Sequence, residues 1–213
     1  GMGVRRNFAC LVVGIIAMLA PVSAAQTTDR AQVMNRIVDG INSPDPVTRM
    51  LTLEQAMATK DKNLQRMALA AAFASSDLAL RTAAIEAVFS LKTTFSVEFT
   101  GMMPGTKDAR FIEKSGGRLD IWVRGFDANT GNFQAHSNFS YWNNITKDYT
   151  LSPGNLSGDR LSLSVNVYKL GSGGASCTGS VVAKDASTLM TGTLICESGS
   201  LEAAYTVQVD LLR

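Results

Sequence analysis

Two cysteines in the second half of the chain are the residues whose number and spacing most directly indicate chemistry. The sequence of 213 residues contains Cys10, Cys177 and Cys196, and Cys10 lies in an amino-terminal apolar run that we expect to be removed. The remaining even pair predicts a disulfide in an exported protein. The alternative, a two-cysteine metal site, lacks partners, because His136 is the only histidine and no Cys-x-x-Cys spacing occurs. We therefore expect a Cys177–Cys196 disulfide and no metal ion or other cofactor.

Side chains that could perform hydrolysis are present, but they do not form a catalytic motif. His136 is the candidate general base, and no serine stands in a Gly-x-Ser-x-Gly sequence. Asp120, Asp127, Asp148 and Asp159 could supply two carboxylates for glycoside hydrolysis. Aspartate is also a common turn residue, and the sequence assigns these four no pairing. The chain is therefore interpreted as non-enzymatic, with an envelope hydrolase as the weakest hypothesis.

Aromatic residues concentrate between positions 122 and 149 and could bind a ligand. Trp122 alternates in step with the polar residues of its predicted strand, so its ring is expected on the outer face. An exposed tryptophan can be a platform for a sugar or a partner. The alternative is that the rings fill the core of the β-domain or its contact with the helices. The candidate ligand-binding residues are Trp122, Tyr141, Trp142, Asn143 and Asn144.

The first residues have the composition of a signal peptide. Gly1, before the first methionine, is interpreted as the remnant of a removed tag. Arg5 and Arg6 precede an apolar run that ends in small residues up to Ala25. This run is shorter than the roughly 20 residues that a comfortable membrane span requires. We expect residues 1–25 to be cleaved, leaving a periplasmic or secreted protein that does not span the membrane. A retained membrane anchor is the alternative.

The charge of the processed chain argues against one class of partner. The whole sequence has 20 basic and 18 acidic side chains. Arg5 and Arg6 leave with the signal peptide, which contains no acidic residue, so 18 of each sign remain. Binding to nucleic acid depends on clustered lysine and arginine. We therefore expect no nucleic-acid partner.

A change of hydrophobic period divides the rest of the chain. Residues 26–93 are rich in alanine, leucine, methionine and glutamine, which favour helix. From Phe95 onward, apolar residues alternate with polar ones between turns rich in glycine, serine and asparagine. The sequence thus predicts an α+β protein, with an all-α segment over 26–93 and an antiparallel β-domain over 94–213. The β-domain is expected to have roughly eight strands in a β-sandwich or small β-barrel.

The helical segment contains a repeat that is marked by aspartates. Asp45, Asp61 and Asp77 are sixteen residues apart, and each could cap the first turn of a helix. Apolar residues follow each aspartate by eight and by twelve positions, which predicts one buried stripe per helix. These residues are Leu53, Leu69, Ile85, Met57, Phe73 and Phe89. An arginine also follows each aspartate by four or five positions, at Arg49, Arg66 and Arg81. An earlier helix is expected at about 29–41.

Two of these openings resemble those of HEAT-like repeat helices. They are Ser-Pro-Asp-Pro-Val-Thr-Arg at 43–49 and Ser-Ser-Asp-Leu-Ala-Leu-Arg at 75–81, and the resemblance covers roughly 27–91. In that family, stacked helix pairs form a curved surface for protein partners, so the resemblance implies partner binding. Only about two pairs are present here, fewer than a solenoid usually needs. The alternative is a four-helix cap packed on the β-domain.

Two main functional hypotheses follow. The leading hypothesis is a non-enzymatic exported protein that binds a protein partner of the cell envelope, through the helical segment or its junction with the β-domain. The alternative is a β-domain that binds a small ligand. That ligand would be a lipid-like molecule inside the domain or a sugar on the aromatic cluster.

Overall fold

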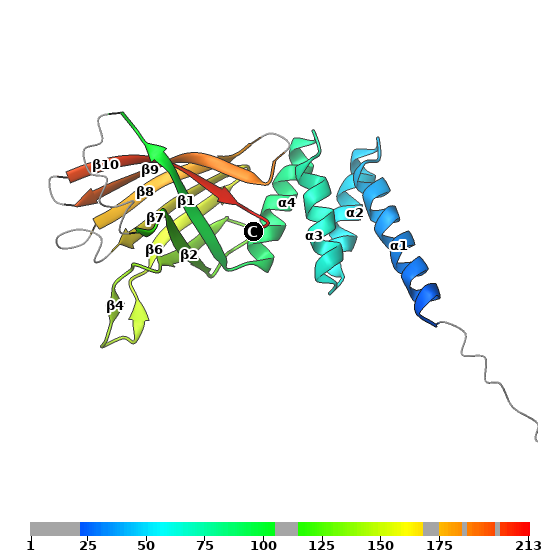
Figure 1. Cartoon of the computed structure of the whole chain (residues 1–213), viewed down its shortest axis with the longest axis horizontal. Coiled ribbons are helices and arrows are strands. Elements are labelled where there is room, and N and C mark those ends of the chain that lie inside the picture. The colour runs from blue at the N-terminus through cyan, green and yellow to red at the C-terminus, as the bar shows by residue number, and fades with distance from the viewer. Residues whose placement is uncertain (1–21, 105–114, 168–174, 185–186, 199–200) are drawn as a thin grey trace, which may run out of the picture.

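The computed structural model describes residues 22–104, 115–167, 175–184, 187–198 and 201–213. Four helices come first, and a β-barrel follows them (Figure 1). Most of the predicted signal peptide lies outside the described residues, and the first helix begins at Val22, ahead of the predicted cleavage at Ala24 or Ala25. None of the described helices is long and apolar enough to cross a membrane.

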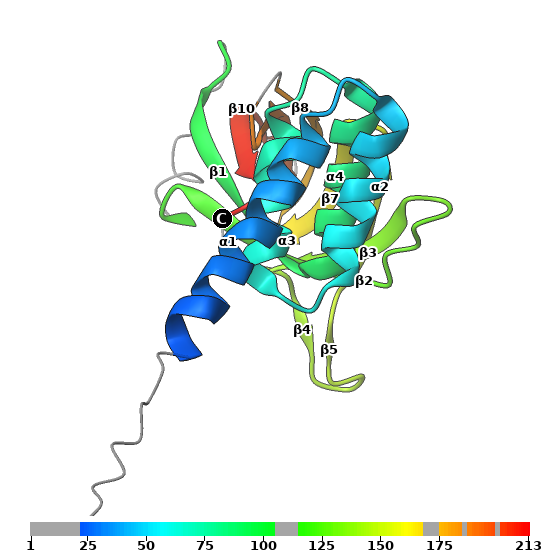
Figure 2. The same ribbon diagram turned by 90° about the vertical axis from the view of Figure 1, so that its right-hand side faces the viewer.

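The helices lie side by side in chain order, and the fourth one contacts the barrel. They are α1 (Val22–Ile41), α2 (Pro46–Ala58), α3 (Lys62–Phe73) and α4 (Leu78–Leu91). Each helix touches the next, and α1 also touches α3 while α2 touches α4. Figure 1 places α4 against one end of the barrel and α1 farthest from it, and Figure 2 views this row of helices from its outer side.

The three repeating aspartates cap the three helices that the spacing predicts. Asp45, Asp61 and Asp77 have extended backbones, and their carboxylates accept hydrogen bonds from the N–H groups of the first turn. Two of them also bind an arginine from the helix two positions earlier. Arg30 of α1 lies 2.7 Å from Asp61, and Arg49 of α2 lies 2.9 Å from Asp77. We call these two pairs the Asp–Arg ladder.

Removal of one cap should be measurable. Asp77→Ala is expected to lower the free energy of unfolding by about 1–2 kcal/mol, because the first turn of α4 loses its acceptor and Arg49 loses its partner. Urea unfolding would measure the change. Asp77→Asn keeps the cap without the ion pair and should be less severe, and Asp39→Ala, on an exposed part of α1, should have little effect. Equal stability of Asp77→Ala and the native protein would contradict the capping role.

The predicted apolar stripes form the helical core. Leu53, Leu69, Ile85, Phe73 and Phe89 are buried, and Met57 is partly buried against them. The stripe follows the helical period, so every helix turns one face to its neighbours. The helical character and the buried faces are thus as predicted, and the likeness to HEAT-like repeats stays a resemblance.

Eight antiparallel strands close into a barrel. The strand order around the barrel is β1-β10-β9-β8-β7-β6-β3-β2, and the barrel closes because β2 pairs with β1. The α+β prediction is therefore confirmed, and of the two predicted architectures the barrel is right and the sandwich is wrong. The strands are β1 (Thr94–Met102), β2 (Arg118–Arg124), β3 (Asn132–Ser137), β6 (Ser152–Ser157), β7 (Arg160–Val167), β8 (Ala175–Ala183), β9 (Leu189–Ser198) and β10 (Leu201–Asp210).

Apolar side chains from the described strands pack inside the barrel. Alternate residues of every strand point inward, among them Leu119, Val165, Met190 and Tyr205, all of which are fully buried. One cavity between β1, β7, β8, β9 and β10 has a volume of only about 10 Å³. An eight-stranded barrel is just wide enough for its own side chains. This cavity is too small for a lipid-like ligand.

The predicted disulfide lies on the inner face of the barrel. Cys177 of β8 and Cys196 of β9 are directly opposite each other, and their sulfurs are bonded. Both side chains are buried. The predicted disulfide is therefore confirmed, and it connects two neighbouring strands.

Helix α4 closes one end of the barrel. The ring of Phe89 stacks on Phe95 of β1, with 4.6 Å between centroids. Its centroid lies 5.6 Å from that of Phe126 and 6.0 Å from that of Phe133. The buried residues of the helices and of the barrel form one continuous core. The two parts are therefore held in a fixed relation by packing.

Candidate functional site

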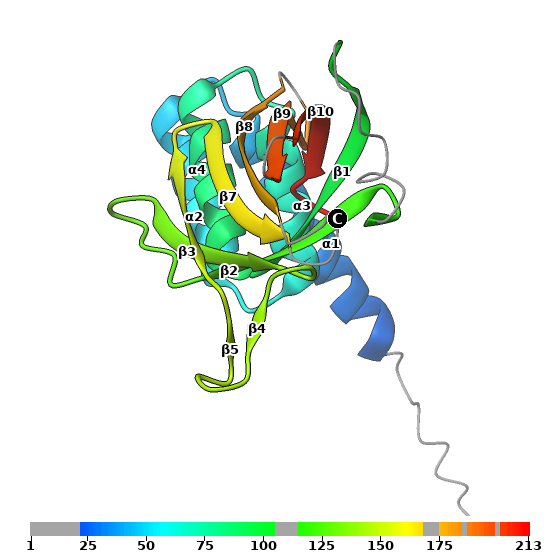
Figure 3. The same cartoon turned by 90° about the vertical axis from the view of Figure 1, so that its left-hand side faces the viewer.

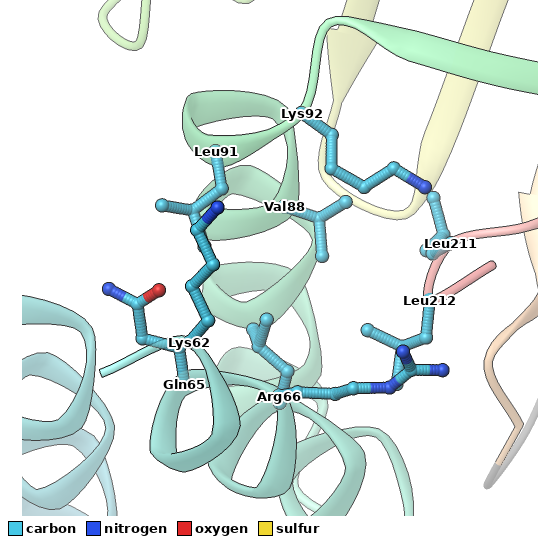
Figure 4. A pocket seen from close by; sticks show the side chains of 9 residues that line it. Lys62, Gln65, Arg66, Val88, Leu91, Lys92, Leu211 and Leu212 are labelled. Carbon is cyan, nitrogen blue, oxygen red and sulfur yellow. The ribbon is translucent and has the colours of Figure 1, made fainter. Parts of the chain in front are cut away.

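An open pocket lies where the helices meet the barrel. Its volume is about 290 Å³, and Figure 4 shows the side chains around it. Three short pieces of chain form its walls: α3, the end of α4, and the residues that follow β10. We call it the junction pocket. It is lined by Lys62, Gln65, Arg66, Leu69, Val88, Leu91, Lys92, Leu211 and Leu212.

The floor of the junction pocket is apolar and its rim is open. Leu69, Val88 and Leu211 are buried, whereas the side chain of Leu91 is 48% exposed. Gln65 of α3 is held by hydrogen bonds to the end of α2, because its side-chain amide donates to the carbonyl oxygens of Met57 at 3.1 Å and Thr59 at 2.6 Å. An apolar surface with a few polar groups around it is the usual composition of a ligand pocket.

The rim of the junction pocket is positively charged. Lys62, Arg66 and Lys92 line it, and no carboxylate is among the described lining residues. None of these three cations takes part in an ion pair between described residues. The Lys92 ammonium donates a hydrogen bond to the carbonyl oxygen of Arg213. The pocket therefore concentrates positive charge in a chain that is nearly neutral overall.

The pKa of Lys92 reflects this environment. Partial burial lowers the pKa of its ammonium below the usual lysine value. The negative charge of Asp210 acts in the opposite direction, and the positive charge of Arg66 lowers the pKa further. Because the folded protein disfavours the charged form of Lys92, an anion in the pocket would relieve a cost that is already present.

The predicted aromatic cluster lies on the outer face of the barrel. Trp122 of β2 and His136 of β3 are directly opposite each other, and their rings stack at 5.2 Å with 7° between planes. Tyr149 stacks on the other side of His136 at 4.4 Å and 8°. Trp142 meets the edge of Tyr149 at 4.9 Å. The prediction that Trp122 points outward is therefore correct.

A two-stranded hairpin carries the outer part of this cluster. It consists of β4 (Trp142–Asn143) and β5 (Asp148–Tyr149), and it projects away from the barrel wall (Figure 3). Asp148 forms an ion pair with Arg124 of β2 at 2.9 Å, which holds the hairpin at its base. The side chain of Trp142 is 42% exposed, and Ile145 at the tip is 92% exposed. The hairpin thus presents apolar side chains to solvent on a fixed base.

The structure places the five predicted ligand-binding residues in different environments. Trp122 and Trp142 belong to one ring array through His136 and Tyr149. Tyr141 is exposed beside them. The Asn143 side-chain oxygen accepts hydrogen bonds from two backbone N–H groups of the hairpin loop, so this amide is structural. Asn144 is exposed in that loop.

His136 occupies an unexpected position. The sequence offered His136 as a candidate general base, but the residue is only 5% exposed and lies between two rings. Its Nδ1 atom is buried without a hydrogen-bond partner among the described residues. Burial lowers the pKa of His136 below the usual histidine value, and Arg124 adds to this effect while Asp148 opposes it. The imidazole is therefore neutral at neutral pH and acts as the centre of the stack.

Acidification should therefore destabilise the protein. Because the pKa of His136 is lower in the folded state, the unfolded state binds more protons below about pH 6.5. The free energy of unfolding is expected to fall as the pH is lowered through the ordinary histidine pKa of about 6.5. Urea unfolding followed by tryptophan fluorescence would measure this. His136→Phe keeps a ring in the stack and should remove this dependence, and an unchanged pH profile in that variant would contradict the assignment.

Three of the four aspartates considered for catalysis have structural partners. Asp148 pairs with Arg124, Asp120 accepts a hydrogen bond from the Ser96 hydroxyl at 2.9 Å, and Asp127 accepts one from the N–H of Asn129. Within the described ranges there is no group of three or more side chains suited to hold a metal ion.

Comparisons with known proteins assign no function to the junction pocket or to the aromatic cluster. No protein-family model matches the chain, and no curated protein or solved structure is significantly similar to it.

Proposed function

We propose that the chain is a non-enzymatic exported protein that binds a protein partner at the junction pocket. The observation that carries the proposal is the combination in that pocket of an apolar floor with three cations that have no described ion pair. The Cys177–Cys196 disulfide supports export, because such bonds persist in oxidising compartments. The periplasm or the extracellular space is the proposed location.

The continuous core between the helices and the barrel favours a binding site at their junction over a site on the helices alone. Phe89 fixes α4 on the barrel, so the pocket walls are held in place before any partner arrives. A preformed site loses less conformational entropy on binding than one that must first be assembled. The outer helices α1 and α2 pack against α3 and α4 and so help to hold them in position.

A capture experiment tests this proposal. The tagged protein is incubated with an envelope extract, and bound proteins are compared with those bound by Leu91→Glu and Leu78→Glu. Leu91 lines the pocket, whereas Leu78 is a similarly exposed leucine, 56% accessible, at the other end of α4. Point variants are preferable to deletion of the helices, because deletion would also remove Phe89 from the barrel core.

The outcome depends on the difference between the two variants. A partner should bind the native protein and Leu78→Glu, and Leu91→Glu should lose it. Circular dichroism would first establish that both variants are folded. Capture that is the same for all three proteins, or that is lost equally in both variants, would contradict a partner site at the junction.

A sugar-binding function is the second candidate, and the exposure of Trp142 favours it. Trp142 stands edge-on to Tyr149 on a hairpin that Arg124 and Asp148 hold in place. Exposed rings on a rigid support can stack against the apolar face of a sugar. Titration with a glycan panel should change tryptophan fluorescence, and Trp142→Ala should abolish the change while Ile145→Ala retains it. No response to any glycan would count against this function.

A further inference from the structure

Helix α3, next to the Asp–Arg ladder, carries an arginine that has no described ion pair. Arg30 of α1 binds the cap of α3, and Arg49 of α2 binds the cap of α4. Arg49 follows the capping aspartate of its own helix by four positions, and Arg66 of α3 follows Asp61 by five. In the sixteen-residue repeat the position of Arg49 is taken in α3 by Gln65, and Arg66 lies one residue later, about 100° further round the helix. No helix follows α4 to offer Arg66 a capping aspartate, because the chain continues into β1 of the barrel.

Arg66 lines the junction pocket as an arginine without a described carboxylate partner. No described ion pair includes it, and its positive charge is close enough to lower the pKa of Lys92. Figure 4 shows the guanidinium of Arg66 and the ammonium groups of Lys62 and Lys92 around the apolar floor. Inside the ladder, Arg49 shows how such a group is satisfied, with Nε 3.0 Å and a terminal nitrogen 2.9 Å from one oxygen of Asp77.

We propose, on the basis of the partner-binding function above, that the partner contributes an acidic and aliphatic peptide segment to the junction pocket. A carboxylate of that segment takes the place at Arg66 that Asp77 takes at Arg49. Lys62 and Lys92 provide further positive charge, and the floor formed by Leu69, Val88 and Leu211 takes the aliphatic side chains.

The shape and charge of the pocket together favour this occupant. A guanidinium matches a carboxylate in geometry and forms stronger hydrogen bonds with it than with neutral acceptors. The pocket is open at its rim and has a volume of about 290 Å³, which suits a few side chains of a segment lying across it. A basic or uncharged segment would provide no counter-charge for Lys62 and Arg66, which have no described ion pair, whereas Lys92 already has Asp210 near it.

Fluorescence anisotropy with defined probes tests the inference on the full-length protein. The probes are a short fluorescein-labelled peptide of alternating leucine and aspartate and its twin with asparagine in place of aspartate. The aspartate peptide should bind more tightly, and its affinity should fall as salt is added. Arg66→Gln should weaken its binding about tenfold or more, because a charge-assisted hydrogen bond is lost. Arg66→Lys should be intermediate.

The control is Arg36→Gln, which removes an exposed arginine of α1 outside the pocket and should leave binding unchanged. Equal affinity for the two peptides, or equal effects of Arg66→Gln and Arg36→Gln, would overturn the inference. Unchanged peptide binding by Leu91→Glu, together with binding of sodium decanoate to the native protein, would also overturn the inference. That result would assign the pocket to an acyl chain.

The capture experiment separates this inference from the proposed function. If a captured partner requires Leu91 but binds Arg66→Gln normally, the partner site stands and the acidic segment is wrong. If the aspartate peptide binds through Arg66 but no envelope protein depends on Leu91, the chemistry of the pocket stands and the proposed function is wrong.

Discussion

Phe89→Ala is expected to lower the free energy of unfolding by about 3–5 kcal/mol. The ring is buried between α4 and the barrel and lies within 6.0 Å, centroid to centroid, of three other phenylalanine rings. Truncation removes its apolar burial and leaves a cavity that a closed barrel end cannot easily collapse around. Guanidinium unfolding would measure the change in free energy.

Two probes can report this unfolding separately in its two parts. Both tryptophans belong to the barrel part of the chain, so their fluorescence follows the barrel, whereas far-ultraviolet circular dichroism is dominated by the helices. In the native protein the two signals should change together, because the core is continuous. Leu91→Ala, on the exposed side of the same helix, should cost far less. A loss below about 1 kcal/mol for Phe89→Ala would contradict the role of α4 as the closure of the barrel.

The double variant Cys177→Ala, Cys196→Ala is expected to be less stable by about 3 kcal/mol. The disulfide joins residues that are 19 positions apart, and a cross-link of this span restricts the unfolded chain by about that amount in the chain-entropy account. Alanine avoids placing a hydroxyl group on the buried inner face of the barrel.

A reducing agent provides the internal control for this prediction. Dithiothreitol should destabilise the native protein towards the stability of the double variant and should leave the double variant unchanged. A double variant as stable as the oxidised native protein would show that the bond contributes nothing to the barrel.

Local patterns were sufficient to predict the helices, most strands and the disulfide. Aspartate capping depends on residues within one turn, so Asp45, Asp61 and Asp77 could be identified as helix starts from the sequence. Alternation likewise identified the inward residues of β2 and β7. These features are fixed by neighbours along the chain.

Strand β6 could not be recognised, because its residues are typical of a turn. Pro153 and Gly154 stand in its first half, and both usually interrupt strands. Gly154 faces Phe133 on β3, where a β-carbon would collide with the aromatic ring. The glycine therefore makes room for a large side chain in the barrel interior, and this requirement is visible only when the two strands are paired.

Closure of the barrel and both candidate sites depend on residues that are distant in sequence. β1 pairs with β2 and also with β10, and this second pairing distinguishes a barrel from a sandwich. The junction pocket joins α3 to Leu211 and Leu212, and the ring array joins β2, β3 and the hairpin. The sequence carried no local signal for the pocket, because its walls come together only when α3 meets the residues that follow β10.

Site-specific photo-crosslinking at the junction pocket tests the central claim most directly. A photoreactive benzoylphenylalanine replaces Leu91, Leu78 or Trp142 in three versions of the full-length protein, which are irradiated in cells that export it. We expect an adduct with a partner protein from position 91, no such adduct from position 78, and loss of the adduct when Arg66→Gln is added. Adducts from position 142 alone, or the same adducts from positions 91 and 78, would contradict it.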